Sequence, residues 1–331
     1  MRLVTYEIDE EPRVGVVQGQ NIIDIGAAFT LVADQDVAQR LMRETYQEGK
    51  TDETEELALA EGFEPIDMIE LLEADLGADT LGTVDRVTQW AVTQADSSEA
   101  PEDLVVPLAS ARLLAPIERP GKITCIGLNY ADHAREQGIE PPASPIFFVK
   151  TANTICGPGD PIVLPPNSTQ VDYEAEFAVV IGKGGKNIPV EKAMEHVAGY
   201  MIMNDVSARD MQFGDKQWYR GKSCDTFAPC GPWIVTKDEV PDPHNLRISL
   251  TLNGQTMQDS NTSNLVFRVP YLISYLSQSV TWEPGDIIST GTPPGVGVFR
   301  KPPVFLKAGD TVSVTVEGLG TLTNPVVEVK Q

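Results

Sequence analysis

Three carboxylates stand at alternate positions, Asp172, Glu174 and Glu176, just before an apolar, β-branched run that ends at Ile181. Such a run is typical of a β-strand, on which alternate side chains point to one face, so the three carboxylates are predicted to share a face. Neighbouring charges would then lie roughly 6–7 Å apart, and their repulsion favours a cation between them. Oxygen ligands alone select Mg²⁺, Mn²⁺ or Ca²⁺ over zinc.

The alternative is a solvated edge of a sheet that is kept acidic to discourage edge pairing. A second apolar run, residues 199–203, ends in Asn204-Asp205 and places another carboxylate at the mouth of a neighbouring strand. With Asp205 added, a divalent metal site is the preferred interpretation of these carboxylates.

His133 and Glu136 are three residues apart in a polar segment with helical character, so they lie on one helical face. A carboxylate behind a histidine orients the ring and makes it more basic, as a general base requires, although a plain surface pair remains the alternative. The HExxH spacing of zinc enzymes is absent. The glycine-rich segment 291–297 lacks the following Lys-Ser or Lys-Thr of a phosphate loop, so a plain turn is the alternative there.

These residues need elements to position them, and 331 residues exceed what one core usually organises. We predict a smaller α+β domain over 1–110, with a β-hairpin at 3–17 and helical periodicity over 34–94, then a linker at 95–103. Residues 111–331 carry short β-branched runs between glycines and prolines, which predicts a mostly-β domain. Its few helical signals are at 130–137, 190–197 and 271–277.

The formal charge of −23 falls mostly in the first 120 residues, where no residue pattern suggests chemistry. An acidic surface repels phosphate backbones, which counts against a nucleic-acid partner; it is also compatible with a high-salt cytoplasm. No apolar run approaches the roughly 20 residues of a membrane helix. The first residues lack the apolar core of a signal peptide, so we expect a cytoplasmic protein without a membrane partner. The four cysteines show no metal-binding spacing and are expected to be reduced.

The sequence resembles the fumarylacetoacetate hydrolase family from about residue 116 to 329. Five motifs occur in the family's order: GLNYADH (127–133) followed by Glu136, DYEAE (172–176), NDVSARD (204–210), GKSCDT (221–226) and GTPPGVG (291–297). The segment 297–307 is similar in particular to the branch called fumarylacetoacetate hydrolase domain-containing protein 2. The resemblance implies a mixed β-sandwich roll for the second domain.

Carried over position by position, the resemblance implies roles for nine residues. Glu174, Glu176 and Asp205 would bind Mg²⁺ or Mn²⁺, and His133 with Glu136 would activate water. Lys222 would steady an enolate or oxyanion, while Arg209, Gln212 and Thr292 would line the substrate pocket, although Arg209 and Lys222 alone would suit ordinary salt bridges. Asp172 is expected to contact the metal ligands and not the metal itself. Asn129 stands near where the founding hydrolase has an acidic ligand, which favours Mg²⁺ or Mn²⁺ over Ca²⁺.

The expected substrate is therefore a small 2-oxo or 1,3-diketo acid, and the first expectation is hydrolysis of a C–C bond in a compound of the acylpyruvate or fumarylacetoacetate type. The alternatives are oxaloacetate keto–enol tautomerisation or decarboxylation, dehydration of a 2-keto-3-deoxy acid, and metal binding without catalysis. The His–Glu pair argues against the last, because a mere metal binder has no use for it. A homodimer is expected, since open sheet edges need covering and the family resemblance points the same way.

Overall fold

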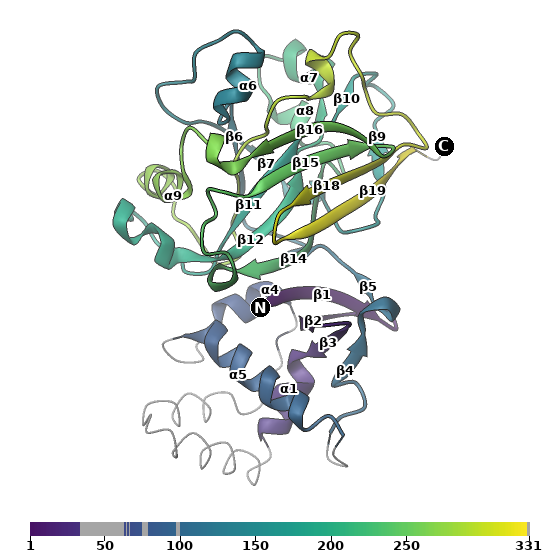
Figure 1. The fold of residues 1–331 in the computed structure, drawn as a ribbon, viewed down its shortest axis with the longest axis vertical. Coiled ribbons are helices and arrows are strands. Elements are labelled where there is room, and N and C mark those ends of the chain that lie inside the picture. The colour runs from purple at the N-terminus through teal and green to yellow at the C-terminus, as the bar shows by residue number, and fades with distance from the viewer. Residues whose placement is uncertain (34–62, 64, 66, 75–78, 97–99, 330–331) are drawn as a thin grey trace. The chain divides into compact units, whose positions relative to one another are not determined.

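The structure is a computed structural model and describes residues 1–33, 63, 65, 67–74, 79–96 and 100–329. The chain forms two compact units, Met1–Leu113 and Leu114–Gln331 (Figure 1). Residues 34–62, 64, 66 and 75–78 of the predicted helical segment 34–94 lie outside the described residues, as do residues 97–99 of the predicted linker. In the part of the chain that the structure describes, no helix has the length and apolar character needed to cross a bilayer.

The first unit is a small antiparallel sheet with helices. The predicted hairpin is present: β1 and β2 pair from Leu3↔Val16 to Ile8↔Glu11, and Asp9 and Glu10 form the turn with positive φ. The helix α5 buries Val84, Val87 and Ala91, the apolar stripe seen in the sequence. The strands are β1 (Arg2–Ile8), β2 (Glu11–Gln18), β3 (Asn21–Asp24), β4 (Val105–Pro107) and β5 (Arg112–Leu113), and the helices are α1 (Ile25–Ala33), α4 (Met68–Glu73) and α5 (Thr80–Thr93).

The second unit is built on a mixed sheet. Its strand order is β14-β12-β11-β17-β6-β7, antiparallel except that β17 and β6 run parallel. All seven residues of β11 are buried, because this interior strand is covered on both faces. The strands are β6 (Ile123–Gly127), β7 (Ile146–Lys150), β11 (Ala175–Ile181), β12 (Val197–Asn204), β14 (Ala228–Thr236) and β17 (Ile287–Ser289), with β8 (Ile155–Cys156) beside β14.

A second sheet crosses in front of β11 and β12 (Figure 1). Its order is β16-β15-β18-β19-β9, and Leu250 and Val314 share one apolar core with Phe177 and Tyr200 of the first sheet. This packing confirms the predicted β-sandwich roll. The strands are β9 (Ile162–Leu164), β15 (Arg247–Leu252), β16 (Gln255–Asn261), β18 (Thr311–Val316) and β19 (Gly320–Glu328).

Short helices lie around the sheets, and α6, α7 and α8 gather at one end of them (Figure 1). The predicted helical segments are present, although the middle one is a 3₁₀-helix. These elements are α6 (Ala131–Glu136), α7 (Arg209–Gly214), α8 (Tyr219–Lys222), α9 (Val269–Ser277) and the 3₁₀-helices η3 (Val190–His196), η5 (Thr262–Asn264) and η6 (Gly297–Phe299); η1 (Leu108–Ser110), η2 (Ala152–Thr154) and η4 (Lys237–Glu239) are single turns.

The prediction of one continuous strand through Asp172, Glu174 and Glu176 is wrong. Asp172 belongs to β10 (Val171–Asp172), which pairs with β13 (Ser207–Ala208), and β11 begins only at Ala175. At the break, side chains bind the two backbone amides in place of a strand partner: the Glu174 amide donates to Asn204 Oδ1 at 3.0 Å and the Ala175 amide to Gln258 Oε1 at 2.9 Å. Asp172 is not among the clustered carboxylates, and Arg209 joins it to Glu174.

Candidate active site

Glu174, Glu176 and Asp205 come together at the ends of two paired strands. Ala175 is opposite Asn204 in the β11–β12 register, which brings the start of one strand next to the end of the other. One oxygen from each carboxylate lies within 4.8 Å of the other two. All three side chains are buried, and the alternative of a solvated sheet edge is excluded because β11 lies inside the sheet.

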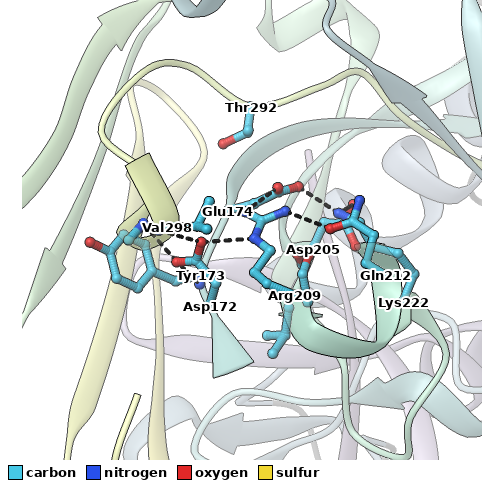
Figure 2. Close-up of polar contacts among 12 residues, drawn as sticks. Asp172, Tyr173, Glu174, Asp205, Arg209, Gln212, Lys222, Thr292 and Val298 are labelled. Atoms are coloured by element: carbon cyan, nitrogen blue, oxygen red, sulfur yellow. Dashed lines mark hydrogen bonds and ion pairs between the residues drawn. The ribbon is translucent and has the colours of Figure 1, made fainter. Parts of the chain in front are cut away.

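Three cations neutralise much of this charge. Lys222 Nζ lies 2.7 Å from both Glu174 Oε2 and Asp205 Oδ2, as Figure 2 shows. The Arg209 guanidinium lies 2.7 Å from Glu174 Oε1 and donates to Asp172 Oδ2 at 2.9 Å. Lys150 donates to Asp205 Oδ1 at 2.6 Å. Lys222 and Arg209 are thus salt-bridge partners of the acidic cluster and also face the adjoining cavity.

The repulsion between carboxylates that these cations do not compensate acts mainly on Glu176. Burial and the charges of Asp205 and Glu174 raise its pKa well above the usual value, because no ammonium or guanidinium ion pairs with it among the described residues. Burial would also raise the pKa of Glu174, but Lys222 and Arg209 lower it to about 2. An oxygen-only set with one under-compensated carboxylate fits a hard divalent ion such as Mg²⁺ or Mn²⁺. Glu174, Glu176 and Asp205 would hold it.

Replacing Lys150 with Met is expected to destabilise the fold by less than the roughly 3–5 kcal/mol that breaking an isolated buried ion pair costs, since Asp205 loses one of its two ammonium partners and keeps Lys222. Urea unfolding measures this free energy. The matched control is Lys192→Met, which breaks a surface pair with Glu195 and should leave the midpoint unchanged. Equal stability of the two variants would show that Lys150 does not support Asp205.

The His133–Glu136 pair forms as predicted from their spacing. His133 Nδ1 lies 3.0 Å from Glu136 Oε2, and the histidine is buried while the Glu136 side chain is about a quarter exposed (27%). Because an ionised carboxylate can only accept, the hydrogen of the neutral ring is on Nδ1 and the lone pair is on Nε2. Asp132 anchors the helix α6 by accepting from Ser260 of β16 at 2.6 Å.

The glycine-rich segment 291–297 serves the protein's own carboxylates. The Gly291 amide donates to Glu176 at 2.9 Å, the Gly295 amide to Glu136 at 3.0 Å, and the Gly297 amide to Asp172 at 2.7 Å. Gly291 and Gly295 have φ of 105° and 103°, which side-chain-bearing residues rarely adopt. This segment, the glycine loop below, is neither a phosphate cradle nor a plain turn.

A cavity of about 120 Å³ adjoins the carboxylates and the dyad. The predicted substrate-binding residues Arg209, Gln212 and Thr292 all line it. Lys222, His133 and the aromatic side chains of Phe148 and Trp218 complete much of the rest of its wall. Thr292 also accepts from Gln258 at 2.8 Å.

Asn129 does not face this cluster. Its buried side chain donates to the backbone carbonyls of Phe267 and Thr290 and accepts from the Phe267 amide, so it is held by the backbone of two other segments. Asp172 likewise stays outside the acidic cluster and instead binds Arg209 and the amides of Gly297 and Val298 (Figure 2).

Sequence reasoning missed two polar residues of the site. Lys150 has a visible signal, because it ends the apolar run of β7 and a lysine there must find a buried partner. Gln137 has one too: it stands four residues after His133, a helical spacing that brings side chains together, and its Nε2 lies 2.9 Å from His133 Nε2.

Buried carboxylates that could hold a divalent ion lie next to an oriented histidine in a small cavity, an arrangement that would suit metal-assisted acid–base chemistry. Residues 122–327 match the family model described as fumarylacetoacetate (FAA) hydrolase C-terminal. The chain belongs to the fumarylacetoacetate hydrolase family and is an enzyme of that family.

Among its relatives, the cattle protein named oxaloacetate tautomerase FAHD2A, mitochondrial, is 53% identical over 265 residues, which cover 80% of each chain. The solved fumarylacetoacetate hydrolase of Exiguobacterium antarcticum is 32% identical, with a TM-score of 0.75 and 99% of each chain covered. Maleylpyruvate hydrolase of Sphingobium sp. SYK-6, solved with manganese(II) and pyruvate, is 30% identical, with a TM-score of 0.71 and all of each chain covered.

The expectation of a cytoplasmic protein is wrong in the light of these relatives, since the cattle protein is named as mitochondrial. The expectation rested on the missing apolar core of a secretory signal. That test does not detect mitochondrial targeting segments, which are amphipathic and rich in arginine and serine.

Proposed function

We propose that the chain is an oxaloacetate keto–enol tautomerase that works with Mg²⁺ or Mn²⁺. The supporting observation is the cavity of about 120 Å³, into which cationic side chains and His133 converge. That volume is far below the roughly 300–1,000 Å³ of pockets for larger ligands, which favours a small diacid. The tautomerase name of a relative at 53% identity supports the same choice.

Each side chain then has a defined task. Arg209 and Lys222 supply positive charge for the substrate carboxylates, and Gln212 and Thr292 add hydrogen-bonding groups. His133 Nε2 accepts the proton from the carbon next to the ketone, and Glu136 stabilises the resulting imidazolium until the proton is delivered to oxygen. A bound divalent ion would supply Lewis acidity that makes this carbon more acidic.

Hydrolysis of an acylpyruvate, the first expectation from the sequence, is less well supported than this alternative. Hydrolysis of fumarylacetoacetate needs room for a longer substrate, and hydrolysis of any acylpyruvate needs room for an attacking water beside Nε2. The choice of metal also stays a proposal: the manganese in the maleylpyruvate hydrolase structure supports Mn²⁺, and the oxygen-only cluster suits Mg²⁺ equally.

The test is to add the metal-loaded protein to freshly dissolved enol oxaloacetate and to follow enol absorbance, with acetylpyruvate and fumarylacetoacetate as parallel substrates. Product analysis separates ketonisation from decarboxylation or C–C cleavage. We expect fast ketonisation of oxaloacetate and slow cleavage of the other two. Cleavage that outpaces ketonisation would refute the tautomerase proposal.

We also propose that the chain forms a homodimer through β7, the last strand in the order of the described sheet. Ile146, Phe147 and Val149 of this strand are exposed to between 39% and 48%, an apolar edge that a second copy could cover. Phe147→Lys is therefore expected to shift the protein from dimer to monomer in light scattering at micromolar concentration. Tyr271→Lys, at an exposed aromatic far along the chain on α9, is the control. A monomeric wild type would contradict the dimer.

A further inference from the structure

The side-chain amide of Gln137 is hydrogen-bonded to Nε2 of His133, the nitrogen that would accept a proton. Gln137 Nε2 lies 2.9 Å from His133 Nε2, and both side chains line the cavity. Nδ1 is already paired with Glu136, so the single in-plane lone pair of Nε2 is the one open position on the ring. Gln137 therefore stands where any other proton donor to this histidine would have to be.

Two kinds of donor could compete for that position. A 2-oxo diacid held by Arg209 and Lys222 has ionic contacts that can offset the loss of one neutral hydrogen bond. A water molecule has no ionic contacts of this kind. It would exchange the hydrogen bond from Gln137 for a similar one and would lose its own translational entropy. In addition, Phe299 packs against the His133 ring at a centroid distance of 5.9 Å and limits the space beside it.

We propose that Gln137 is a specificity-determining residue that keeps water off His133 Nε2 and restricts the dyad to protons carried by the substrate. The proposal rests on the tautomerase function proposed above. In tautomerisation, the C–H bond breaks, its proton goes to Nε2, its electron pair forms the enolate, and the proton then returns to the enolate oxygen.

Hydrolysis needs a different donor at the same atom. A water O–H bond would break, its proton would go to Nε2, and the hydroxide oxygen would bond to the carbonyl carbon before the C–C bond breaks with its electron pair leaving as an enolate. Only the second route requires a water next to Nε2. Because Gln137 occupies the place of that water, it hinders hydrolysis and leaves tautomerisation open.

The experiment compares three variants with wild type, each loaded with Mg²⁺: Gln137→Ala, Gln137→Asn and Gln137→Met. The readout is the rate of acetylpyruvate hydrolysis divided by the rate of oxaloacetate ketonisation. Alanine and asparagine vacate the space at Nε2, so this ratio should rise at least tenfold in both. Methionine fills the space without a hydrogen bond, so its ratio should stay within about threefold of wild type.

A ratio that does not rise in Gln137→Ala and Gln137→Asn would overturn the proposal, and so would an equal rise in Gln137→Met. A second readout needs no substrate: ¹⁵N NMR of the three histidines should show His133 protonated on Nδ1 in wild type. A ring hydrogen found on Nε2 would also overturn it. If wild type fails to ketonise oxaloacetate, the proposed function falls. Hydrolysis rates alone across the three variants still decide the role of Gln137.

Discussion

Glu176→Gln is expected to abolish divalent-metal binding and turnover while leaving a folded protein. Glu176 accepts from Ser289 at 2.5 Å and from the Gly291 amide, and a glutamine oxygen can replace both acceptors. The amide cannot supply the negative charge that a hydrated ion needs from its third carboxylate. Because changes around metal ligands already cost 10–100-fold in affinity, loss of a direct ligand should exceed about 100-fold. Calorimetric titration with Mn²⁺ measures this directly.

The pKa of Glu176 makes this substitution more informative than an alanine. A carboxyl with a raised folded pKa contributes stability that is complete below its unfolded value near 4.5 and is lost as the pH rises toward the folded value. Glutamine does not lose a proton, so the metal-free variant at pH 7 should be at least as stable as metal-free wild type. By contrast, Asp205→Ala would leave Lys150 without its carboxylate and Lys222 with Glu174 alone, and this variant should unfold more easily. Tight Mn²⁺ binding by Glu176→Gln would remove this residue from the metal site.

His133→Gln should slow oxaloacetate ketonisation by roughly 10²–10⁴-fold, the usual worth of a positioned general base. Before the structure is considered, Lys222 could have substituted as a base. However, its ammonium contacts Glu174 and Asp205, and although burial lowers its pKa, these two carboxylates raise it overall. Lys222 is therefore held in its charged form and cannot take up a proton.

The control for His133 is His196→Gln, since His196 binds the Lys183 carbonyl at the surface and should leave ketonisation unchanged. Glu136→Gln should cause a smaller loss than His133→Gln, because the base remains but loses its orienting carboxylate. A His133→Gln rate within threefold of wild type would take the dyad out of the mechanism. In that case another group would have to transfer the proton.

Much of this site could be predicted because its chemistry is local in the sequence. Three carboxylates before an apolar run and one after the next run predicted a cluster, and all but Asp172 come together because paired antiparallel strands bring such ends side by side. The His133–Glu136 contact follows from a three-residue helical spacing. Short β-branched runs predicted a mostly-β domain, and the family resemblance implied its β-sandwich roll.

What could not be predicted depends on contacts between distant segments. The break before β11 is set by Asn204 and Gln258, which lie 30 and 83 residues away from the amides they bind. Lys150 reaches Asp205 across 55 residues. Sequence periodicity predicts which side chains lie on the same face of a strand. It does not predict which distant side chain binds a backbone amide in place of a strand partner, so the break before β11 and the role of Lys150 could be found only from the structure.

The glycine loop has a consequence for how substitutions combine. Its three amides hold Glu136 of the dyad, Glu176 of the acidic cluster and Asp172, which in turn binds Arg209. A shift of this segment would therefore change the positions of all three carboxylates together. Energetic effects add only for residues that share no partner. Changes at the dyad and at the metal ligands should accordingly prove non-additive in a double-mutant cycle, although no hydrogen bond joins the two groups directly among the described residues.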